Sequence, residues 1–512
     1  MHGQGSQHAA GHGEVSGRRP CGSQASVSCP SHTARPQCVG AIPARRETPA
    51  PPKGRRVTRA DCTSDPLDCR GAASRVNRQH RNRGTLGGAA TRNRVCPDST
   101  RPRALRTMKL ADQPLLAGGI RMSGASAGML AWFLSTAVWG AEVTAIDPQP
   151  SAGRSAAIVV ADGPLLHTGQ LLPGGPFVAP TAPDEQVRQV FSRLEDVLKA
   201  NHSRPADVVK LNFYVAHPSV MERIDQELAA RYAGPAPPAV SVVQTAFAHG
   251  GVMVAVDAVA RTAGPAPDRV VRAKPSAADR PANTALMPPG PHVYISGQAE
   301  KGDGTLADAT RQTMRSLIET LRFLELSTAD VVHVKAFLTP IADAAAARQA
   351  ILAAFPEEAA PPVSFVEWIS SLPIEIELIA SARPRPGAPR IEYLTPPGMT
   401  ASPIFARVVR VNVPQRVYTS GLFGRKEPQS AEEVHDLFAE LKRIVEAGGS
   451  DLRHLAKATY YVSDDAVSRL LNEIRPEYYA PDRPPAASKA MVAGTGRPGR
   501  RITLDMIAVP KE

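Results

Sequence analysis

The stretch DVVKLNFYV, residues 207–215, decides the fold because it recurs twice along the chain. The copies read DVVHVKAFL at residues 330–338 and HLAKATYYV at residues 454–462, at offsets of 123 and 247 residues. Each copy is rich in β-branched and aromatic residues, which are typical of strands. Similarity at a nearly constant period is the signature of a repeat architecture. The chain is therefore predicted to contain three consecutive copies of one folding unit.

An amphipathic helix is predicted before each copy of this strand. Apolar residues between positions 187 and 198 follow the spacing of one helix face, and the same spacing returns between positions 434 and 445. Met314, Leu317 and Leu321 mark the middle helix. Three helices at matching offsets support the repeat.

Other elements complete the unit. A strand that ends in a glycine turn precedes each helix, reading LLHTGQ at 165–170, VYISGQ at 293–298 and VYTSGL at 417–422. A second helix and two closing strands follow the repeated strand. The predicted fold is therefore α+β, with the order β-β-α-β-α-β-β in each unit. The expected domains are residues 150–262, 285–383 and 398–511, separated by Pro-rich linkers near 262–285 and 383–398.

The first 107 residues differ from the rest in composition. They hold 19 Lys or Arg against 6 Asp or Glu, no Phe, Trp or Tyr, and all six cysteines. A segment with so little apolar surface cannot offset the entropy of ordering its backbone, so residues 1–107 are predicted to be a disordered basic tail. An Arg-rich arm that binds nucleic acid is the alternative. The predicted domains contain no cysteine, which excludes a thiol nucleophile there.

An apolar run lies between the tail and the repeats. AGMLAWFLSTAV, residues 127–138, is too short to span a bilayer, and small residues at Gly140 and Ala145 follow it. This pattern is typical of a secretory signal peptide, which we place at 108–145. The hypothesis requires translation to begin at Met108 or Met122, and it predicts an exported, periplasmic protein with no membrane anchor in its mature form. An ordinary buried helix in a cytoplasmic protein is the alternative, and N-terminal sequencing distinguishes the two.

The element order, the S-G-Q turn, the D-V-V-K strand, and a P-A-x-S strand before an I-E-I-E-x-I-A strand resemble the RidA/YjgF family, also labelled endoribonuclease L-PSP. The resemblance covers residues 150–511. It implies a chorismate-mutase-like fold that forms trimers with a cleft at each subunit boundary. A single copy would expose an apolar sheet face, which three copies in one chain can cover internally. We therefore expect a monomer that forms an intramolecular pseudo-trimer.

The family's best-known activity is deamination: the hydrolysis of reactive imine or enamine acids to 2-keto acids and ammonia, without a cofactor. An Arg in the P-A-R-S strand grips the substrate carboxylate bidentately, and a Glu on the closing strand positions the attacking water. In this chain the Arg positions are Val240, Val363 and Ala487. The Glu positions are Ala255, Glu375 and Thr503, so the resemblance assigns the catalytic role to Glu375 alone.

The glycine turns are the candidate ligand-binding elements, through their backbone N–H and hydroxyl groups. These residues are Thr168, Gly169, Gln170, Ser296, Gly297, Gln298, Ser420 and Gly421. The alternative is that the glycines only adopt backbone conformations closed to other residues.

Charged residues near these motifs have two interpretations each. Glu375 is either catalytic or an exposed strand acid. The other closing-strand acids, Asp257, Glu377 and Asp505, are expected to face solvent. Arg483 and Lys489 either supply replacement positive charge or lie on the surface.

Three functions remain open. The first is a divergent hydrolase that acts on imines or enamines, and the second is a non-catalytic module that binds a small ligand or a partner in the clefts. The third is an endoribonuclease, although the near-neutral charge of the predicted domains argues against nucleic-acid binding. No metal-binding or nucleotide-binding motif is present, so neither metal nor cofactor is expected. Ammonia release by the protein and a Val363→Arg variant separates the first two.

Overall fold

The computed structural model describes residues 143–174, 182–273, 284–355, 360–424 and 431–512. The chain divides into the units Met1–Gly124 and Ala125–Glu512, and all described residues belong to the second. The expected tail at 1–107 lies outside the described residues, as does the expected export segment up to residue 142. The last three residues of that segment, 143–145, begin strand β1 (Val143–Gln149). No helix in the described part of the chain is long and apolar enough to cross a bilayer.

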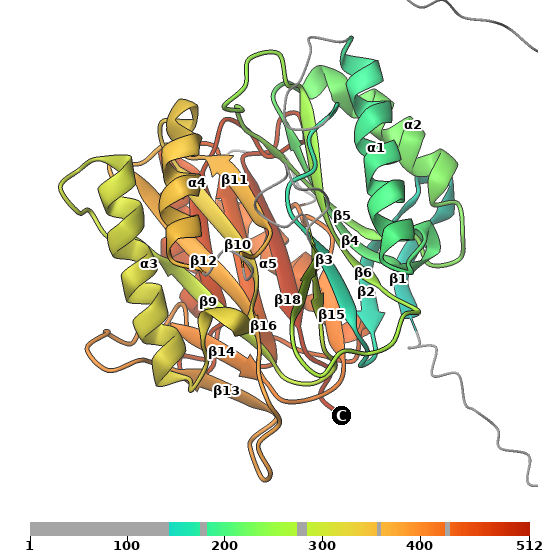
Figure 1. The fold of residues 1–512 in the computed structure, drawn as a ribbon. Coiled ribbons are helices and arrows are strands. Elements are labelled where there is room, and N and C mark those ends of the chain that lie inside the picture. Colours follow the sequence, from blue (N-terminus) through green and yellow to red (C-terminus); the bar gives the residue numbers. More distant parts are fainter. Residues whose placement is uncertain (1–142, 175–181, 274–283, 356–359, 425–430) are drawn as a thin grey trace, which may run out of the picture. The chain divides into compact units, whose positions relative to one another are not determined.

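The predicted α+β unit occurs three times, in the predicted element order (Figure 1). Repeat 1 comprises β2 (Arg154–Val160), β3 (Leu165–Thr168), α1 (Pro183–Ala200), β4 (Val208–Val215), α2 (Met221–Arg231), β5 (Ala239–Gln244) and β6 (Val254–Arg261). Repeat 2 comprises β8 (Thr284–Met287), β9 (His292–Gln298), α3 (Leu306–Phe323), β10 (Val331–Leu338), α4 (Ala344–Ala353), β11 (Val363–Glu367) and β12 (Ile374–Ser381). Repeat 3 comprises β14 (Val408–Val411), β15 (Arg416–Thr419), α5 (Ala431–Ala447), β16 (Leu455–Val462), α6 (Asp465–Ile474), β17 (Ala486–Met491) and β18 (Ile502–Ala508).

Each repeat also begins with a strand that the sequence did not indicate. β1 pairs with β2, β7 (Val271–Ala273) with β8, and β13 (Ile391–Leu394) with β14, all antiparallel. β7 and β13 lie in the two segments predicted to be linkers. These strands lie among prolines and glycines and are too short to show a strand pattern in the sequence. They form because the next strand offers an unpaired edge.

The first predicted strand of every repeat pairs with a strand of a different repeat. β8 of repeat 2 pairs with β3 of repeat 1, and β14 of repeat 3 pairs with β9 of repeat 2. β2 of repeat 1 pairs with β15 of repeat 3, so the exchange is cyclic. The strands form a 12-stranded and a 6-stranded sheet. The larger sheet contains β1–β8 and β15–β18, and it is continuous because β2, which pairs with β15 of repeat 3, also pairs with β5 of repeat 1 at Ser155 and Ala239.

One face of the strands of each repeat packs under that repeat's helices. In repeat 1, Phe191 and Leu194 of α1 are buried against Phe213 of β4, with the two phenylalanine rings 5.5 Å apart. The predicted apolar stripes of α3 and α5 are buried in the corresponding cores of repeats 2 and 3. Helix periodicity in the sequence therefore identified the faces that bury apolar surface.

The opposite face of each repeat is covered by the other two repeats. Tyr214, Phe337 and Tyr461 occupy equivalent places in the three repeated strands and pack in one apolar cluster. A second cluster joins Leu165, Tyr294, Tyr418 and residues of the exchanged strands. Three copies in one chain thus bury the sheet face that a single copy would expose.

Candidate functional site

Sheet register shows which residues are equivalent in the three repeats. Ala255, Glu375 and Thr503 lie opposite the aromatic residues Tyr214, Phe337 and Tyr461 on the neighbouring strand. Val240, Val363 and Ala487 lie opposite the fifth residue of the three repeated strands, Leu211, Val334 and Ala458. Within each of the two sets, the three residues inferred from the motifs therefore occupy equivalent places in the three repeats.

The glycine turns are not aligned as their sequences indicate. Thr168 Oγ1 accepts a hydrogen bond from the backbone N–H of Ala258 (2.9 Å), and Thr419 Oγ1 accepts one from Met506 (3.0 Å). Ala258 and Met506 occupy the same place on the closing strand, so Thr168 is equivalent to Thr419. The predicted equivalence of Thr168 with Ser420 is therefore wrong by one residue, because strand pairing and not the glycine fixes the register.

This offset changes what the first turn contributes. Gly169 occupies the place of Ser296 and Ser420, and Gln170 occupies the place of Gly297 and Gly421. Each turn faces the strand of another repeat that carries the residue at the predicted family Arg position. We name these places the 1–2 junction (Gly169, Gln170 and β11), the 2–3 junction (Ser296, Gly297 and β17) and the 1–3 junction (Ser420, Gly421 and β5).

The 1–2 junction is filled by a side chain. The Gln170 amide donates a hydrogen bond to the Phe365 carbonyl (3.1 Å), and the Gln170 backbone N–H donates to the Val363 carbonyl (3.3 Å). Ala255 stands where the acid would be and Val363 where the Arg would be, so neither of these two positions is charged at this junction.

The 2–3 junction keeps the acid. Glu375 of β12 is half-buried and lies directly against Gly297, where a Cβ atom would fall 2.0 Å from Glu375 Oε1. Ser296 Oγ accepts a hydrogen bond from the Ala487 N–H (2.7 Å), which joins the turn to β17. Neither Gly169, Gly297 nor Gly421 has a positive φ angle, so the conformational explanation of these glycines is wrong. Gly297 is needed for space.

The environment of Glu375 favours proton transfer near neutral pH. Burial raises the pKa of its carboxyl group to about 7, against the opposing effects of the Ser488 hydroxyl and the Lys489 ammonium. Both of those groups come from β17 of the next repeat, so the interpretation of Glu375 as an exposed acid is wrong. Lys489 is half-buried and donates to Ser468 (2.9 Å) and Asn472 (3.2 Å), which shows that it is not a plain surface residue. Burial lowers the Lys489 pKa.

The 1–3 junction is open. Ser420 Oγ accepts a hydrogen bond from the Val240 N–H (2.7 Å), and Gly421 N–H donates to the Val240 carbonyl (3.0 Å). A cavity of about 640 Å³ lies beside these contacts. Thr503 holds the place of the acid and donates a hydrogen bond to the Leu422 carbonyl (3.1 Å).

The two remaining candidate residues, Gln298 and Arg483, have their hydrogen bond and ion pair outside these junctions. Gln298 is buried and donates to Thr320 of α3 (2.8 Å). Arg483 is largely exposed and pairs with its neighbour Asp482 (3.4 Å).

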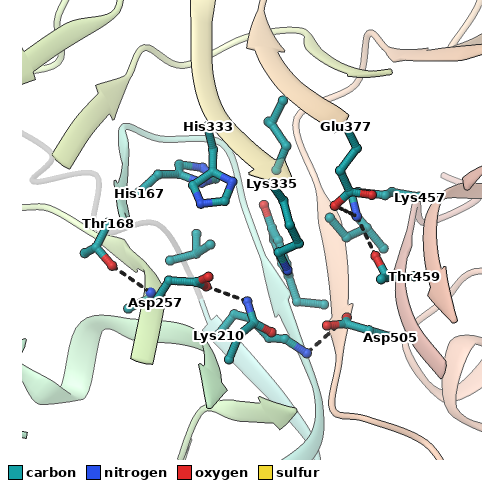
Figure 2. Close-up of a pocket in the computed structure, with 16 residues that line it drawn as sticks. His167, Thr168, Lys210, Asp257, His333, Lys335, Glu377, Lys457, Thr459 and Asp505 are labelled. Carbon is teal, nitrogen blue, oxygen red and sulfur yellow. Dashed lines mark hydrogen bonds and ion pairs between the residues drawn. The ribbon is translucent and has the colours of Figure 1, made fainter. Parts of the chain in front are cut away.

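A polar pocket lies where the three repeats meet (Figure 2). Lys210 of repeat 1 pairs with Asp505 of repeat 3 (3.0 Å), and Lys457 of repeat 3 pairs with Glu377 of repeat 2 (2.8 Å). Asp257 of repeat 1 accepts a hydrogen bond from Ser364 of repeat 2 (2.7 Å). The expectation that the three closing-strand acids face solvent is therefore wrong, because each one pairs with a residue of another repeat.

Two histidines, His167 and His333, complete this pocket (Figure 2). Burial lowers the pKa of His167 to about 3 and that of His333 to about 4, so both imidazoles are neutral at pH 7. Burial also opposes ionisation of Asp257, but the Lys335 ammonium lowers the Asp257 pKa below its usual value. A recurring signal marked this pocket: the fourth residue of each repeated strand is polar, reading Lys210, His333 and Lys457.

The endoribonuclease L-PSP family model matches the chain three times, at residues 145–262, 274–382 and 399–510. Among solved structures, a YjgF-family protein from Neisseria meningitidis is 25% identical and covers 24% of this chain and 96% of its own, with a TM-score of 0.19. A Rid-family protein from Yersinia pestis is 30% identical and covers 23% of this chain and 98% of its own, with a TM-score of 0.22. Comparison with curated proteins gives no match. Because the family model matches well over half of the sequence, this chain belongs to the RidA/YjgF (endoribonuclease L-PSP) family and carries three tandem copies of its domain.

Proposed function

We propose that the protein is a RidA-like hydrolase of imine or enamine intermediates, with Glu375 at the 2–3 junction as its catalytic acid and base. The observation that carries the proposal is the Glu375 carboxyl group, half-buried against Gly297 with a pKa of about 7. A general acid or base is most effective when its pKa lies near the working pH. Neither of the other two junctions has a carboxyl group at this place.

The reaction divides into two proton transfers from oxygen to nitrogen, both through Glu375. The Glu375 carboxylate accepts a proton from water while the water oxygen bonds to the imine carbon, and it passes this proton to the nitrogen, which gives a neutral carbinolamine. The carboxylate then accepts the hydroxyl proton of the carbinolamine and passes it to the amine nitrogen as the carbon–nitrogen bond breaks, which yields a carbonyl compound and ammonia. One water is consumed, and the carboxyl group returns to its starting state.

The 2–3 junction also restricts the substrate. Ala487 stands where the family Arg would hold a carboxylate bidentately, and the positive group that acts on Glu375 is the single ammonium of Lys489. An ammonium does not reproduce the two parallel hydrogen bonds of a guanidinium. We therefore propose imines or enamines that lack the usual carboxylate as the preferred substrates.

Ammonia release tests this function. Imines are generated in situ by an amine oxidase or an amino acid oxidase, and release is followed with the protein and with Glu375→Gln. We expect acceleration by the protein and the uncatalysed rate with Glu375→Gln. A Thr503→Val variant, changed at the equivalent place of the 1–3 junction, should keep the activity.

Two arginine variants give a matched comparison. Ala487→Arg places a guanidinium in the same junction as Glu375, so release from 2-imino acids should increase about tenfold or more. Val363→Arg places one in the 1–2 junction, which Gln170 fills and which lacks an acid, so it should leave the rate unchanged. If the protein and Ala487→Arg both stay at the uncatalysed rate on every imine, the hydrolase function is rejected.

A further inference from the structure

One wall of the 2–3 junction comes from α6 and β17 of repeat 3, and it carries a lysine. The corresponding wall of the 1–3 junction comes from repeat 1 and contains four residues that line the cavity there, Met221, Asp225, Val240 and Val242. The offset of 247 residues between repeats 1 and 3 relates these four to Ser468, Asn472, Ala487 and Lys489. Lys489 therefore occupies the place at which Val242 lines the cavity of the other junction.

The register of the strands gives the same equivalence. Val242 and Lys489 lie opposite equivalent residues of the repeated strands β4 and β16, Phe213 and Tyr460. In repeat 2 this place belongs to Phe365 of β11. A lysine is thus present at one of the three equivalent places, in the same junction as the Glu375 carboxyl group.

The Lys489 amine is held by neutral hydrogen-bond acceptors. Its Nζ atom donates to Ser468 Oγ (2.9 Å) and to Asn472 Oδ1 (3.2 Å), both on α6. Among the described residues, no carboxylate lies within ion-pair distance of Lys489. Neutral acceptors orient the amine but stabilise its charged form less than a carboxylate in direct contact would.

A second cation lies beside this lysine. Arg475 is buried, and its Nη2 atom donates to the same Asn472 Oδ1 (3.0 Å). Its guanidinium also lies 5.6 Å from the centre of the Tyr460 ring. Burial lowers the pKa of Lys489 and the Arg475 charge lowers it further, against the raising effect of Glu375. A lysine that is desolvated next to another cation has a larger neutral fraction, and the neutral amine is the nucleophile.

Glu375 supplies the proton transfers that an amine needs to react with a carbonyl group. Its carboxyl group has a pKa of about 7, so protonated and ionised forms are both present at neutral pH. The Lys489 ammonium is one of the groups that act on it electrostatically. The 2–3 junction therefore combines a nucleophilic amine with an acid that can also serve as a base.

We propose that Lys489 forms a Schiff base with a small aldehyde or ketone in the 2–3 junction, with Glu375 as proton donor and acceptor. The neutral amine bonds to the carbonyl carbon while Glu375 donates a proton to the carbonyl oxygen. The Glu375 carboxylate then takes a proton from the nitrogen, which gives a carbinolamine. Glu375 donates this proton to the hydroxyl group as the carbon–oxygen bond breaks, so that water leaves and a protonated imine of Lys489 remains.

This covalent step goes beyond the hydrolysis proposed above. Carbonyl compounds are the products of that hydrolysis, so the Schiff base would retain a product of the same chemical class. The bond itself requires the amine of Lys489 and does not require that the protein hydrolyses a free imine. Adduct formation and ammonia release are therefore measured separately.

Reductive trapping of the full chain with isobutyraldehyde and cyanoborohydride at pH 7 tests the site. The reductant converts the imine into a stable secondary amine, and peptide mass spectrometry locates the added isobutyl group. We expect Lys489, although half-buried, to be modified about tenfold or more faster than Lys442, which is exposed on α5. In concentrated urea the two lysines should react at similar rates, since the activation depends on the folded junction.

A conservative variant and the ammonia assay complete the test. Lys489→Arg keeps the positive charge but cannot form an imine, so it should lose the fast-reacting site while Lys442 reacts as before. Modification of Lys489 no faster than that of Lys442, or a difference that persists in urea, overturns the proposal. Trapping at Lys489 without ammonia release rejects the hydrolase alone, and ammonia release without trapping at Lys489 rejects the Schiff base alone.

Discussion

The Lys457 ammonium of repeat 3 lies 2.8 Å from the Glu377 carboxylate of repeat 2, and both side chains are almost fully buried. Lys210 and Asp505 form the matching contact between repeats 1 and 3. Removing one member of a buried pair leaves an uncompensated charge, which costs more than the intact pair contributes. The joint between the repeats therefore depends on charged groups as well as on apolar packing.

Lys457→Met should lower the free energy of unfolding by about 3–5 kcal/mol, because Glu377 loses its partner in a buried place. Urea denaturation followed by circular dichroism measures the change. The control is Lys442→Met on α5, which breaks an exposed pair with Glu446 and should cost about 0.5 kcal/mol or less. A double variant, Lys457→Met with Glu377→Met, should recover part of the loss; equal effects of Lys457→Met and Lys442→Met would contradict the argument.

Gly297→Ala should impair ammonia release about a hundredfold with little loss of stability. The new Cβ atom collides with the end of the flexible Glu375 side chain, which can turn away, but a displaced acid no longer reaches the substrate. Gly234→Ala is the control, since no heavy atom lies within 4 Å of a Cβ atom built there. Activity and thermal unfolding are measured for both variants, and an active Gly297→Ala protein would argue against Glu375 as the catalytic group.

The rate of hydrolysis should rise with pH around a midpoint of about 7, because Glu375 must be ionised to accept a proton from water. The Lys489 ammonium stabilises the ionised form of Glu375. Lys489→Met should therefore move the midpoint to higher pH, whereas Lys442→Met should not. Rate profiles between pH 5.5 and 9, run in parallel on the three proteins, measure the midpoints; an identical profile for Lys489→Met would count against this assignment.

Stability should fall as the pH decreases from about 6.5 towards 4. Burial lowers the pKa of His333 from 6.5 to about 4, so the unfolded chain binds a proton that the folded chain does not take up in this window. The stabilisation is complete above pH 6.5 and is lost progressively below it, by at most about 3 kcal/mol for this shift. Urea denaturation at pH 7, 5.5 and 4.5 measures the slope, which His333→Gln should reduce; an unchanged slope would contradict the assignment.

The protein should be a monomer in solution. The strands exchanged in the structure, β2, β8 and β14, all find partners within the same chain, and the apolar inner faces are covered by the other repeats. We therefore expect sedimentation equilibrium to give the mass of one chain. A mass of three chains would refute the intramolecular pseudo-trimer.

The sequence predicted the elements well because their signals are local. The apolar stripe of α1 and the strand β4 are recognisable within fewer than twenty residues, and the period of the repeat confirmed them. The sequence did not predict β7 and β13, because segments of three or four residues are too short to show the alternation of a strand. These segments become strands only by pairing with a neighbouring strand.

The candidate site was predictable in part. The motifs predicted equivalent positions for Val240, Val363 and Ala487, and strand pairing places all three opposite the same residue of the repeated strand. The role of Glu375 stays a prediction. The place of Gln170 was not predictable, because the sequence does not show a shift of one residue in the turn before the strand is paired.

The sequence by itself determined that this protein has three copies of one domain, and it predicted that none keeps the family arginine and that one keeps the acid. The tertiary structure alone decided which of these residues meet. Gln170 contacts Phe365 and Ser296 contacts Ala487 across separations of 195 and 191 residues, so each junction combines two repeats. A side chain's neighbours, and hence its burial, charge partners and pKa, follow from that assembly. Glu375 thus becomes a candidate catalyst only when β17 of the next repeat covers it.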